Sequence, residues 1–343
     1  MFTVPYPALP LNTSPKGHWK KMNKKRSTFF VALFLLLIMS MISDLNGSSS
    51  FPENFQERVD AIIQLITKGE EKGKAYDLLA YISDTFGPRM IGTDAYLMSA
   101  KELLQNMARD GFNNVQMQDV YNVTHWTRGE VEVLQMFEPR YIHKMEVMAL
   151  GSSIGGSVEK AEVVVVENWK ELDEKNVKGK IVLFNVAWDG YGNTVQYRSR
   201  GPSEAQKRGA VAALVRSVTP FSLYTAHTGM TNFEENQEKI ISATITVEDS
   251  EMIARMVKRG QRVVLSMKFD CKNLQPTTSW NIVGEITGSK YPNEVIVAGG
   301  HWDSWDVGTG SVDDAGGVIV VYEAIKALIK LGLRPKRTIR VGK

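Results

Sequence analysis

Apolar residues recur at helical spacing in three stretches near the start of the globular sequence. Residues 54–68 place four valine and isoleucine side chains on one helical face, and residues 74–83 predict a second helix. A loop rich in helix-breaking residues, 86–94, precedes a third helix at 95–110, which Gly111 ends. The early part of the fold is therefore expected to be helical.

From about residue 126 the pattern changes to short apolar runs separated by glycine and asparagine, which is typical of strands. These runs lie at 129–137, 145–151, 161–167, 180–186, 210–217, 239–247 and 261–269. Two helical stretches, 203–209 and 248–260, and a loop, 217–239, interrupt them. Residues ~126–272 are therefore expected to form a strand-rich module of their own.

The C-terminal part alternates between strand and helix. Strands are predicted at 281–288, 294–300 and 337–341, with a helix at 314–331. A strand–helix–strand order predicts a crossover with a parallel strand pair, so the fold class is α/β. The run at 294–300 is nearly continuous in apolar residues, and we expect it in the buried interior of the sheet.

An apolar run of 14 residues, 29–42, stands apart from this pattern. It is shorter than the ~20 residues that cross a bilayer as a helix, so no stable membrane span is expected. It fits the hydrophobic part of a signal peptide covering residues 1–46, with translation starting at Met1 or Met22; a short signal anchor is the alternative. Both interpretations send the chain into the secretory pathway, to the outside of the cell or to the lysosome, endoplasmic reticulum or Golgi.

The net charge of +3 comes from this leader. Residues 1–43 contain six basic residues and no acidic one, and without these six, 35 basic residues face 38 acidic ones. They are Lys16, Lys20, Lys21, Lys24, Lys25 and Arg26. The remaining sequence has no basic excess and no arginine-rich stripe, which argues against nucleic acid as a partner.

In the secretory pathway, disulfide formation and N-glycosylation both become relevant. Cys271 is the single cysteine, so no intrachain disulfide can form. Asn46-Gly-Ser and Asn122-Val-Thr match the acceptor pattern for N-glycosylation, so Asn46 and Asn122 are candidate modification sites.

The candidate chemistry lies in residues 301–317, HWDSWDVGTGSVDDAGG. His301 follows the predicted strand directly, at the sheet edge where α/β proteins place ligands. Asp303, Asp313 and Asp314 bring like charges close to it, which is costly unless a cation lies between them. Helix capping and Gly-Asp turns are the plainer interpretation, but they account for one acidic residue rather than for the whole set. The pattern lacks the alternating acids of a calcium loop, and the histidine favours zinc.

This stretch resembles the first metal motif of the aminopeptidase-type di-zinc peptidases. Further segments look like the same family in the same order, and the resemblance covers residues ~53–341. They are DTFGPRMIGTDA, ALGSSIGG, GKIVLFN, YTAHTGM, TVEDSEMIARM, NIVGEITGSKYP and LGLRPKRTIR.

The resemblance implies a sheet-and-helix catalytic domain, incomplete in this chain, that is interrupted by a strand-rich protease-associated insert. On this basis the leader, 1–46, is followed by the helical part of the catalytic domain at 47–125. The insert then covers 126–272, and the catalytic domain resumes at 273–343.

The resemblance also implies roles for individual residues. His301 would ligate one zinc ion, Asp313 would bridge two zinc ions, and Asp303 would orient His301. The reaction would be hydrolysis of dipeptides with free termini, so the partners would be small peptides, and family members commonly form homodimers.

The sequence departs from the family after residue 341. The family continues to a pair of glutamates, of which the first is the general base, and then to further ligands; residues 1–343 contain none of these elements. We therefore expect a C-terminally truncated member. The alternatives to a zinc peptidase are a catalytically inactive truncated form and a protease-associated binding module.

Two other features attract a functional interpretation. Gly151-Ser-Ser-Ile-Gly155 matches the G-x-S-x-G elbow of serine hydrolases, but that elbow needs a following helix, and a strand-like run follows here; a turn is the favoured interpretation, with no nucleophile at Ser153. His227 in the loop YTAHTGM either faces the substrate from the insert or lies at the surface, and the surface is the favoured interpretation. His125 is expected to be structural.

Overall fold

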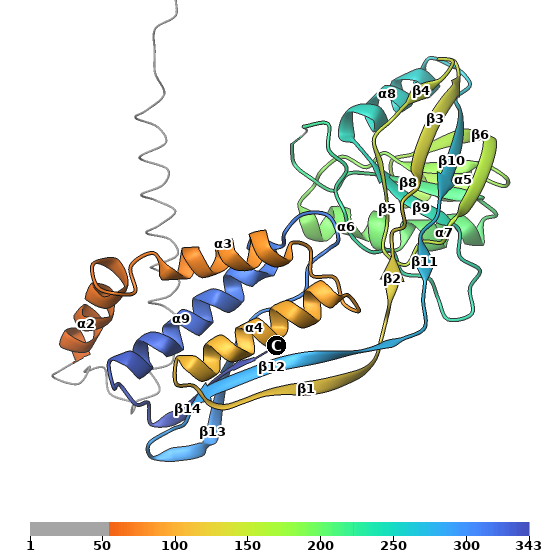
Figure 1. Ribbon diagram of the computed structural model, residues 1–343. Helices are drawn as coiled ribbons and strands as arrows, with labels where there is room; N and C mark the ends of the chain where they lie inside the picture. Colours follow the sequence, from red (N-terminus) through yellow and green to blue (C-terminus); the bar gives the residue numbers. More distant parts are fainter. Residues whose placement is uncertain (1–54, 222, 343) are drawn as a thin grey trace, which may run out of the picture.

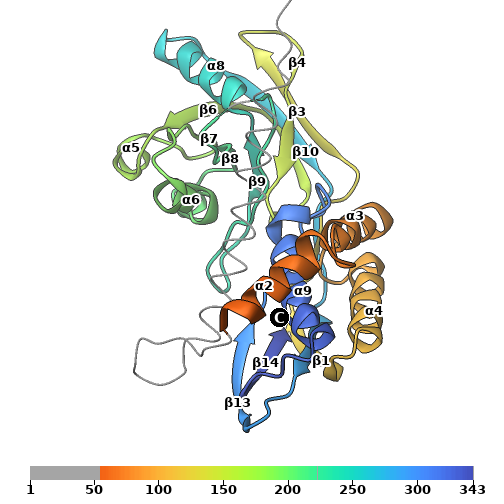
Figure 2. The ribbon, with the colours of Figure 1, turned by 90° about the vertical axis from the view of Figure 1, so that its left-hand side faces the viewer.

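Two β-sheets, connected by a pair of long strands, organise the computed structural model, which describes residues 55–221 and 223–342 (Figure 1). Figure 2 shows the same division after a quarter turn, with the smaller sheet at the lower end and the larger sheet at the upper end. The predicted leader, 1–46, and the sequon at Asn46 lie outside the described residues.

The smaller sheet has four strands in the order β1-β12-β14-β13. Their bounds are β1 Asn113–Val123, β12 Thr277–Ile286, β13 Tyr291–Ala298 and β14 Arg337–Gly342. The first two pairs are antiparallel, whereas β13 and β14 are parallel, as the strand–helix–strand pattern predicts.

Four helices lie on one side of this sheet; two of them contact its strands, and the other two pack against those helices (Figure 1). They are α2 Phe55–Thr67, α3 Lys74–Phe86, α4 Asp94–Arg109 and α9 Gly316–Lys330, and a short π-helical turn, η1 Ser311–Ala315, leads into α9. Thr93 caps α4 by accepting a hydrogen bond from the Tyr96 backbone N–H. Their apolar faces and the sheet share one core, in which Leu103, Trp302 and Ile325 are almost fully buried.

The prediction that residues 294–300 run through the interior of the sheet is wrong. β13 is hydrogen-bonded to β14 alone, so it is an edge strand, and most of its residues are exposed. Val295 and Val297 are 39% and 66% exposed. An apolar run shows that a strand can be buried on both faces, but it does not show whether a neighbouring strand covers its edge.

Strands also begin earlier than the expected boundary near residue 126. β1 starts at Asn113 because its partner supplies the pattern: Gln116 pairs with Val283, and Val123 pairs with Thr277. The exposed residues of β1 leave little apolar alternation in its own sequence. The antiparallel ladder with β12 therefore determines this strand more than local composition does.

The larger sheet has eight strands in the order β4-β3-β10-β6-β7-β8-β9-β5. Their bounds are β3 Glu132–Glu138, β4 His143–Lys144, β5 Val147–Ala149, β6 Gly156–Val166, β7 Ile181–Phe184, β8 Ala212–Arg216, β9 Ile241–Ile245 and β10 Val264–Phe269. The four strands from β6 to β9 are mutually parallel, and the others pair antiparallel.

Four helices connect the strands of the larger sheet. They are α5 Trp169–Glu174, α6 Tyr191–Ser199, α7 Gly201–Lys207 and α8 Val247–Lys258. The sequence predicts α7 and α8 but not α5 and α6, because α5 has only six residues and α6 has no marked apolar face. A two-stranded ladder of β2 Trp126–Thr127 with β11 Lys272–Asn273 lies between the two sheets.

A cluster of buried charges fixes α9 against the loop between α2 and α3. The Glu71 side chain is 1% exposed and contacts the ammonium groups of Lys326 at 2.9 Å and Lys330 at 2.7 Å. Lys326 also lies 3.3 Å from Asp110, which accepts a hydrogen bond from the Tyr322 hydroxyl. Because each of these charges has an opposite partner, the cluster tolerates its burial.

Candidate metal centre

The two predicted metal ligands meet at the carboxyl end of β13. His301 comes three residues after the strand, and its Nε2 lies 2.7 Å from Oδ1 of Asp313. Both side chains reach solvent, with 44% and 83% of their surface exposed. The backbone at Gly300 passes so close to Asp314 that a Cβ at Gly300 would overlap the Asp314 carboxylate. Glycine is therefore required for this approach.

The second nitrogen of His301 is held by Asp303. Nδ1 lies 2.9 Å from the backbone carbonyl of Asp303 and 3.5 Å from its carboxylate. The carbonyl is thus the nearer acceptor, and it favours the tautomer with the proton on Nδ1 and a lone pair on Nε2. Burial alone would lower the pKa of His301, but the contacts with Asp303 and Asp313 outweigh it and raise that pKa.

The donor chemistry of this pair suits zinc, since imidazole nitrogen and carboxylate oxygen are both common zinc ligands. The number of donors is smaller than a complete site needs. Within 55–221 and 223–342, no group of three or more histidine, cysteine, aspartate or glutamate side chains could hold a metal ion. His301 and Asp313 alone are therefore fewer donors than a complete zinc site has.

Asp314, next to Asp313, faces the start of α9. Its carboxylate lies so close to Gly300 and Gly317 that a Cβ at either glycine would overlap it. The peptide bond between Asp313 and Asp314 is cis. A carboxylate at a helix N-terminus interacts favourably with the helix dipole, which is consistent with a supporting role for Asp314.

Arg89, which the sequence analysis does not single out, holds the loop that carries these ligands. Its side chain is fully buried and donates to the backbone carbonyls of Trp302 at 3.0 Å, Thr309 at 2.6 Å and Gly310 at 3.1 Å. Its own backbone N–H donates to the Ser304 hydroxyl. The planar guanidinium thus ties both ends of the loop between His301 and Asp313 to the segment before α4.

Arg128 connects the same loop to the larger sheet. Its guanidinium makes a two-pronged ion pair with Asp306, at 2.6 and 2.8 Å, and also contacts Glu132 at 3.1 Å. Beside this pair, Trp305 packs so close to Gly151 that a Cβ there would overlap the indole ring. The tip of the loop is therefore anchored on residues that precede and follow β3.

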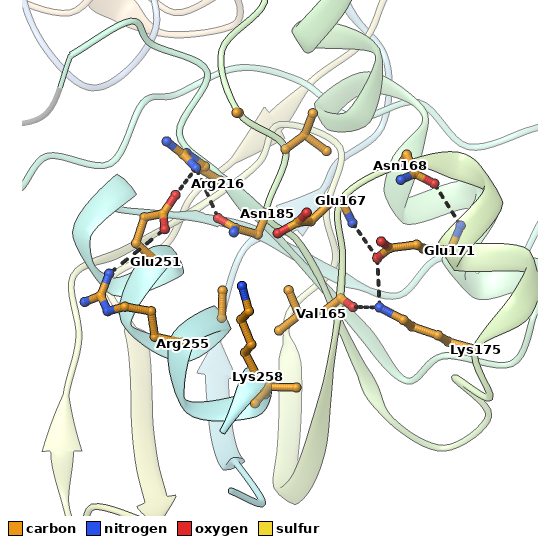
Figure 3. A pocket seen from close by; sticks show the side chains of 14 residues that line it. Val165, Glu167, Asn168, Glu171, Lys175, Asn185, Arg216, Glu251, Arg255 and Lys258 are labelled. Atoms are coloured by element: carbon orange, nitrogen blue, oxygen red, sulfur yellow. Dashed lines mark hydrogen bonds and ion pairs between the residues drawn. The ribbon is translucent and has the colours of Figure 1, made fainter. Parts of the chain in front are cut away.

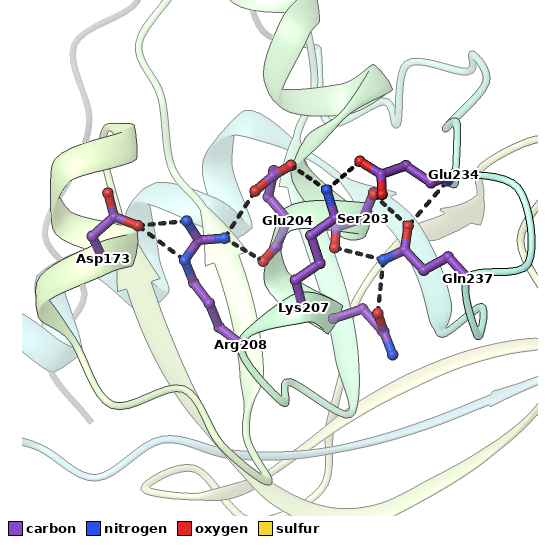
Figure 4. Close-up of polar contacts among 8 residues, drawn as sticks. Asp173, Ser203, Glu204, Lys207, Arg208, Glu234 and Gln237 are labelled. Carbon is purple, nitrogen blue, oxygen red and sulfur yellow. Dashed lines mark hydrogen bonds and ion pairs between the residues drawn. The ribbon is translucent and has the colours of Figure 1, made fainter.

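The loop at 217–239 approaches this junction from the larger sheet. His227 is exposed, as predicted, and its Nδ1 lies 3.3 Å from Arg198. Partial burial of the imidazole and the nearby guanidinium of Arg198 lower the pKa of His227. The end of the loop is anchored at Gln237, which accepts from the Ser203 hydroxyl at 2.7 Å and donates to the Ser203 carbonyl at 2.9 Å (Figure 4).

The G-x-S-x-G stretch forms a turn, as predicted. Strand β6 follows it, so the strand–turn–helix context of a nucleophile elbow is absent. The Ser153 side chain is 1% exposed and accepts a hydrogen bond from the Ser242 backbone N–H at 2.9 Å. The Ser153 hydroxyl therefore stabilises the turn.

His125, expected to be structural, is half-buried against Gly92.

Two further sequence predictions concern the surface. Asn122 is exposed on β1, where a glycan would meet solvent. In the part of the chain that the structure describes, no helix is long and apolar enough to cross a membrane.

Comparison with known proteins assigns this chain to a family. The model of peptidase family M28 matches residues 281–342. Carboxypeptidase Q from Mus musculus is 43% identical over 331 residues, which cover 92% of this chain and 70% of that protein. A carboxypeptidase Q of Homo sapiens is 45% identical over 285 residues, and the match covers 60% of its length.

Among solved structures, a peptidase M28 precursor from Shewanella amazonensis SB2B superposes with a TM-score of 0.77 at 31% identity. The match covers 84% of this chain and 67% of that one. These similarities confirm the predicted family and the predicted α/β fold class. The chain belongs to peptidase family M28 and is a relative of carboxypeptidase Q.

Proposed function

We propose that this chain belongs to a secreted zinc metallopeptidase that hydrolyses dipeptides with free termini, with His301 and Asp313 as metal ligands. The general-base glutamate and the further ligands that the family resemblance implies are not among residues 1–343. The observation that carries the proposal is the convergence of these two side chains, 2.7 Å apart, at the end of β13. Membership of a peptidase family that includes carboxypeptidase Q supports the reaction class. We propose two zinc ions in the complete centre, with Asp313 between them.

Each residue at the site then has a defined task. Bound zinc would supply a polarised water and a positive charge next to the scissile carbonyl. His301 would present Nε2 to a bound metal, because Asp303 holds Nδ1, and Arg89 keeps the loop between His301 and Asp313 in place. Asp303 is a positioning residue, since it acts through His301.

A second candidate function is a non-catalytic binding module of the same family. It is favoured by the number of donors, since no third metal-binding side chain joins His301 and Asp313 within the described ranges. A catalytic zinc site normally has three protein ligands. The two candidates therefore differ in metal content.

The experiment measures zinc content and hydrolysis on the protein secreted by cells that express the full chain. We expect bound zinc by elemental analysis, and cleavage of unblocked dipeptides that stops on chelation and returns with zinc. N-acetylated and C-terminally amidated dipeptides should be poor substrates. His301→Ala and Asp313→Ala should each lose zinc, while His227→Ala serves as a control with normal zinc content.

A metal-free protein that is folded, by circular dichroism, and inactive on dipeptides would favour the binding module. Activity that survives chelation and both ligand substitutions would contradict the metallopeptidase proposal.

The remaining proposals concern location and organisation. The apolar run at 29–42 supports passage through the secretory pathway, and the exposed Asn122 supports a glycan on the mature protein. We propose that residues 126–272 form a protease-associated insert; the strands of the larger sheet lie within 132–269, which supports this division. A homodimer, which the family resemblance implies, stays a prediction.

A further inference from the structure

A cavity of about 710 Å³ lies in the larger sheet and is separate from the residues around His301. All of its lining residues fall within 165–258, and they surround the carboxyl ends of β6, β7 and β8 under helix α8 (Figure 3). This is the edge of a parallel sheet at which α/β proteins bind small ligands, and the volume is in the range of such sites.

The Asn185 amide and the Lys258 ammonium at this cavity have no acceptor among the residues that the structure describes. Asn185 is 5% exposed, and its carbonyl oxygen accepts from Arg216 at 3.3 Å and from Ser250 at 2.8 Å. These bonds fix the amide group, and its NH₂ finds no acceptor in the described parts of the chain. The ammonium of Lys258 also has no ion-pair partner among these residues, and Figure 3 shows it reaching into the cavity. Donors without acceptors favour a ligand that carries a carboxylate.

One carboxylate at the cavity also lacks a hydrogen-bond or ion-pair partner among the described residues. Glu171 is paired with Lys175 at 2.8 Å, and Glu251 contacts Arg216. The carboxylate of Glu167, in contrast, has no hydrogen bond or ion pair within the described residues, and it lies near Asn185 in Figure 3. An unpaired carboxylate beside unpaired donors suits a ligand with both an ammonium and a carboxylate group.

The rest of the lining adds an apolar component. Val165 and Val186 lie at the strand ends, and Ala254 and Val257 face them from α8. We propose that this cavity is a binding site for a small zwitterion with an aliphatic side chain, as in a free α-amino acid. Lys258 and Asn185 hold its carboxylate, Glu167 holds its ammonium, and the apolar side chains surround its aliphatic part. The site is independent of the metal centre.

The test titrates the full secreted chain with L-leucine by isothermal titration calorimetry, with and without a chelator. We expect one binding event per chain that the chelator does not change. N-acetyl-leucine lacks the ammonium group, and leucinamide lacks the carboxylate. Each should bind at least about tenfold more weakly than leucine, as expected for the loss of one charge-assisted contact.

Lys258→Ala and Glu167→Gln should each weaken leucine binding by about tenfold or more. Both change exposed side chains, and Lys170→Ala on the outside of α5, where the side chain is 82% exposed, is the matched control and should bind normally. The proposal is overturned if leucine does not bind at millimolar concentration or if both variants bind it as the unchanged chain does. Equal binding of N-acetyl-leucine and leucine also overturns it. Should a variant fail to fold, the comparison of the three ligands on the unchanged chain decides alone.

Discussion

Arg89 shows how a single side chain can position a site without touching its ligands. Its guanidinium is buried and donates hydrogen bonds to four backbone carbonyls. Burial lowers its pKa, and the nearby negative charge of Asp303 opposes that effect. Four hydrogen bonds from a rigid fork compensate for the burial of the charge, and they cannot be reproduced by a single ammonium.

Arg89→Lys should therefore destabilise the protein although it keeps the charge. Carbonyls of Trp302, Thr309 and Gly310 would be left without donors, at about 1–3 kcal/mol for each buried group that stays unsatisfied. We expect a loss of about 3 kcal/mol in the free energy of unfolding by urea, together with weaker zinc binding in a competition assay.

The matched control for this change is Arg109→Lys, at the exposed end of α4. It should change the free energy of unfolding by less than about 0.5 kcal/mol. Equal stability of the two variants would show that the carbonyl contacts of Arg89 contribute little.

Gly317, at the start of α9, allows a prediction of whether an alanine substitution stabilises or destabilises the protein. Replacing a helical glycine by alanine usually stabilises a protein by up to about 1 kcal/mol. Gly317→Ala should instead destabilise it, by about 1–3 kcal/mol, because the new methyl group would overlap the Asp314 carboxylate. Thermal unfolding followed by circular dichroism measures the difference.

Gly192→Ala in α6 is the control, because a Cβ there meets no atom within 4 Å. It should leave the melting temperature unchanged or raise it. A stabilising Gly317→Ala would mean that Asp314 moves without cost and does not depend on this glycine.

The sequence predicts some of these residues and not others, for a physical reason. His301 and Asp313 can be found because a histidine at a strand end and clustered acids are rare combinations within a few residues. Arg89 and Arg128 act on carbonyls and carboxylates that lie far away in the sequence. Nothing in their local sequence distinguishes them from surface arginines.

At the scale of elements, α9 depends on charge as well as on apolar packing. Burial alone would raise the pKa of Glu71, but hydrogen bonds from Lys330, Lys326 and Lys74 outweigh it and lower that pKa to about 2. A carboxyl with a lowered pKa stabilises the fold above its unfolded pKa, near 4.5, and loses this contribution as the pH falls toward 2. The stability of α9 should therefore decrease in acid.

Glu71→Gln tests this contribution. At pH 7 it should cost about 3 kcal/mol, because the buried Lys326 loses its nearest counter-charge. The difference in the free energy of unfolding between the variant and the unchanged chain should shrink as the pH falls from about 4.5 toward 2. Over this range Glu71 of the unchanged chain becomes neutral, as the glutamine of the variant always is. Urea unfolding across this pH range measures it.

Glu70→Gln is the control at the neighbouring position. Glu70 contacts Lys330 at 2.8 Å, but its side chain is 63% exposed, so the urea midpoint at pH 7 should not change. A pH-independent difference for Glu71→Gln would contradict the electrostatic explanation.

Most elements can be predicted from periodicity, and the two errors that concern strands share one cause. The helices at α2, α4 and α9 have long apolar faces, which a single sequence reveals. β1 and the exposed edge of β13 depend instead on which strand lies alongside, and that is decided by residues more than a hundred positions away for β1. Pairing of this kind leaves little trace in local composition.

At the scale of the whole molecule, Arg128 and Asp306 join the loop between His301 and Asp313 to the larger sheet. Their side chains are 9% and 24% exposed, so solvent screens this pair much less than a surface pair. We expect a double-mutant cycle of Arg128→Ala and Asp306→Ala to give a coupling of about 2 kcal/mol in the free energy of unfolding.

The exposed pair Arg262 and Glu138, at 2.8 Å, is the control cycle and should give less than about 1 kcal/mol. Equal couplings would mean that the junction is no stronger than an ordinary surface contact.

The pairing of Val123 with Thr277 has one further consequence. Strands β1 and β12 are antiparallel neighbours, and the chain leaves the end of one and returns to the start of the other. Topologically they form a β-hairpin in which an entire eight-stranded sheet occupies the position of the reverse turn. In this arrangement the inserted segment begins and ends at neighbouring positions, the end of β1 and the start of β12. Its size and shape can therefore diverge widely while the ladder between β1 and β12 keeps its register.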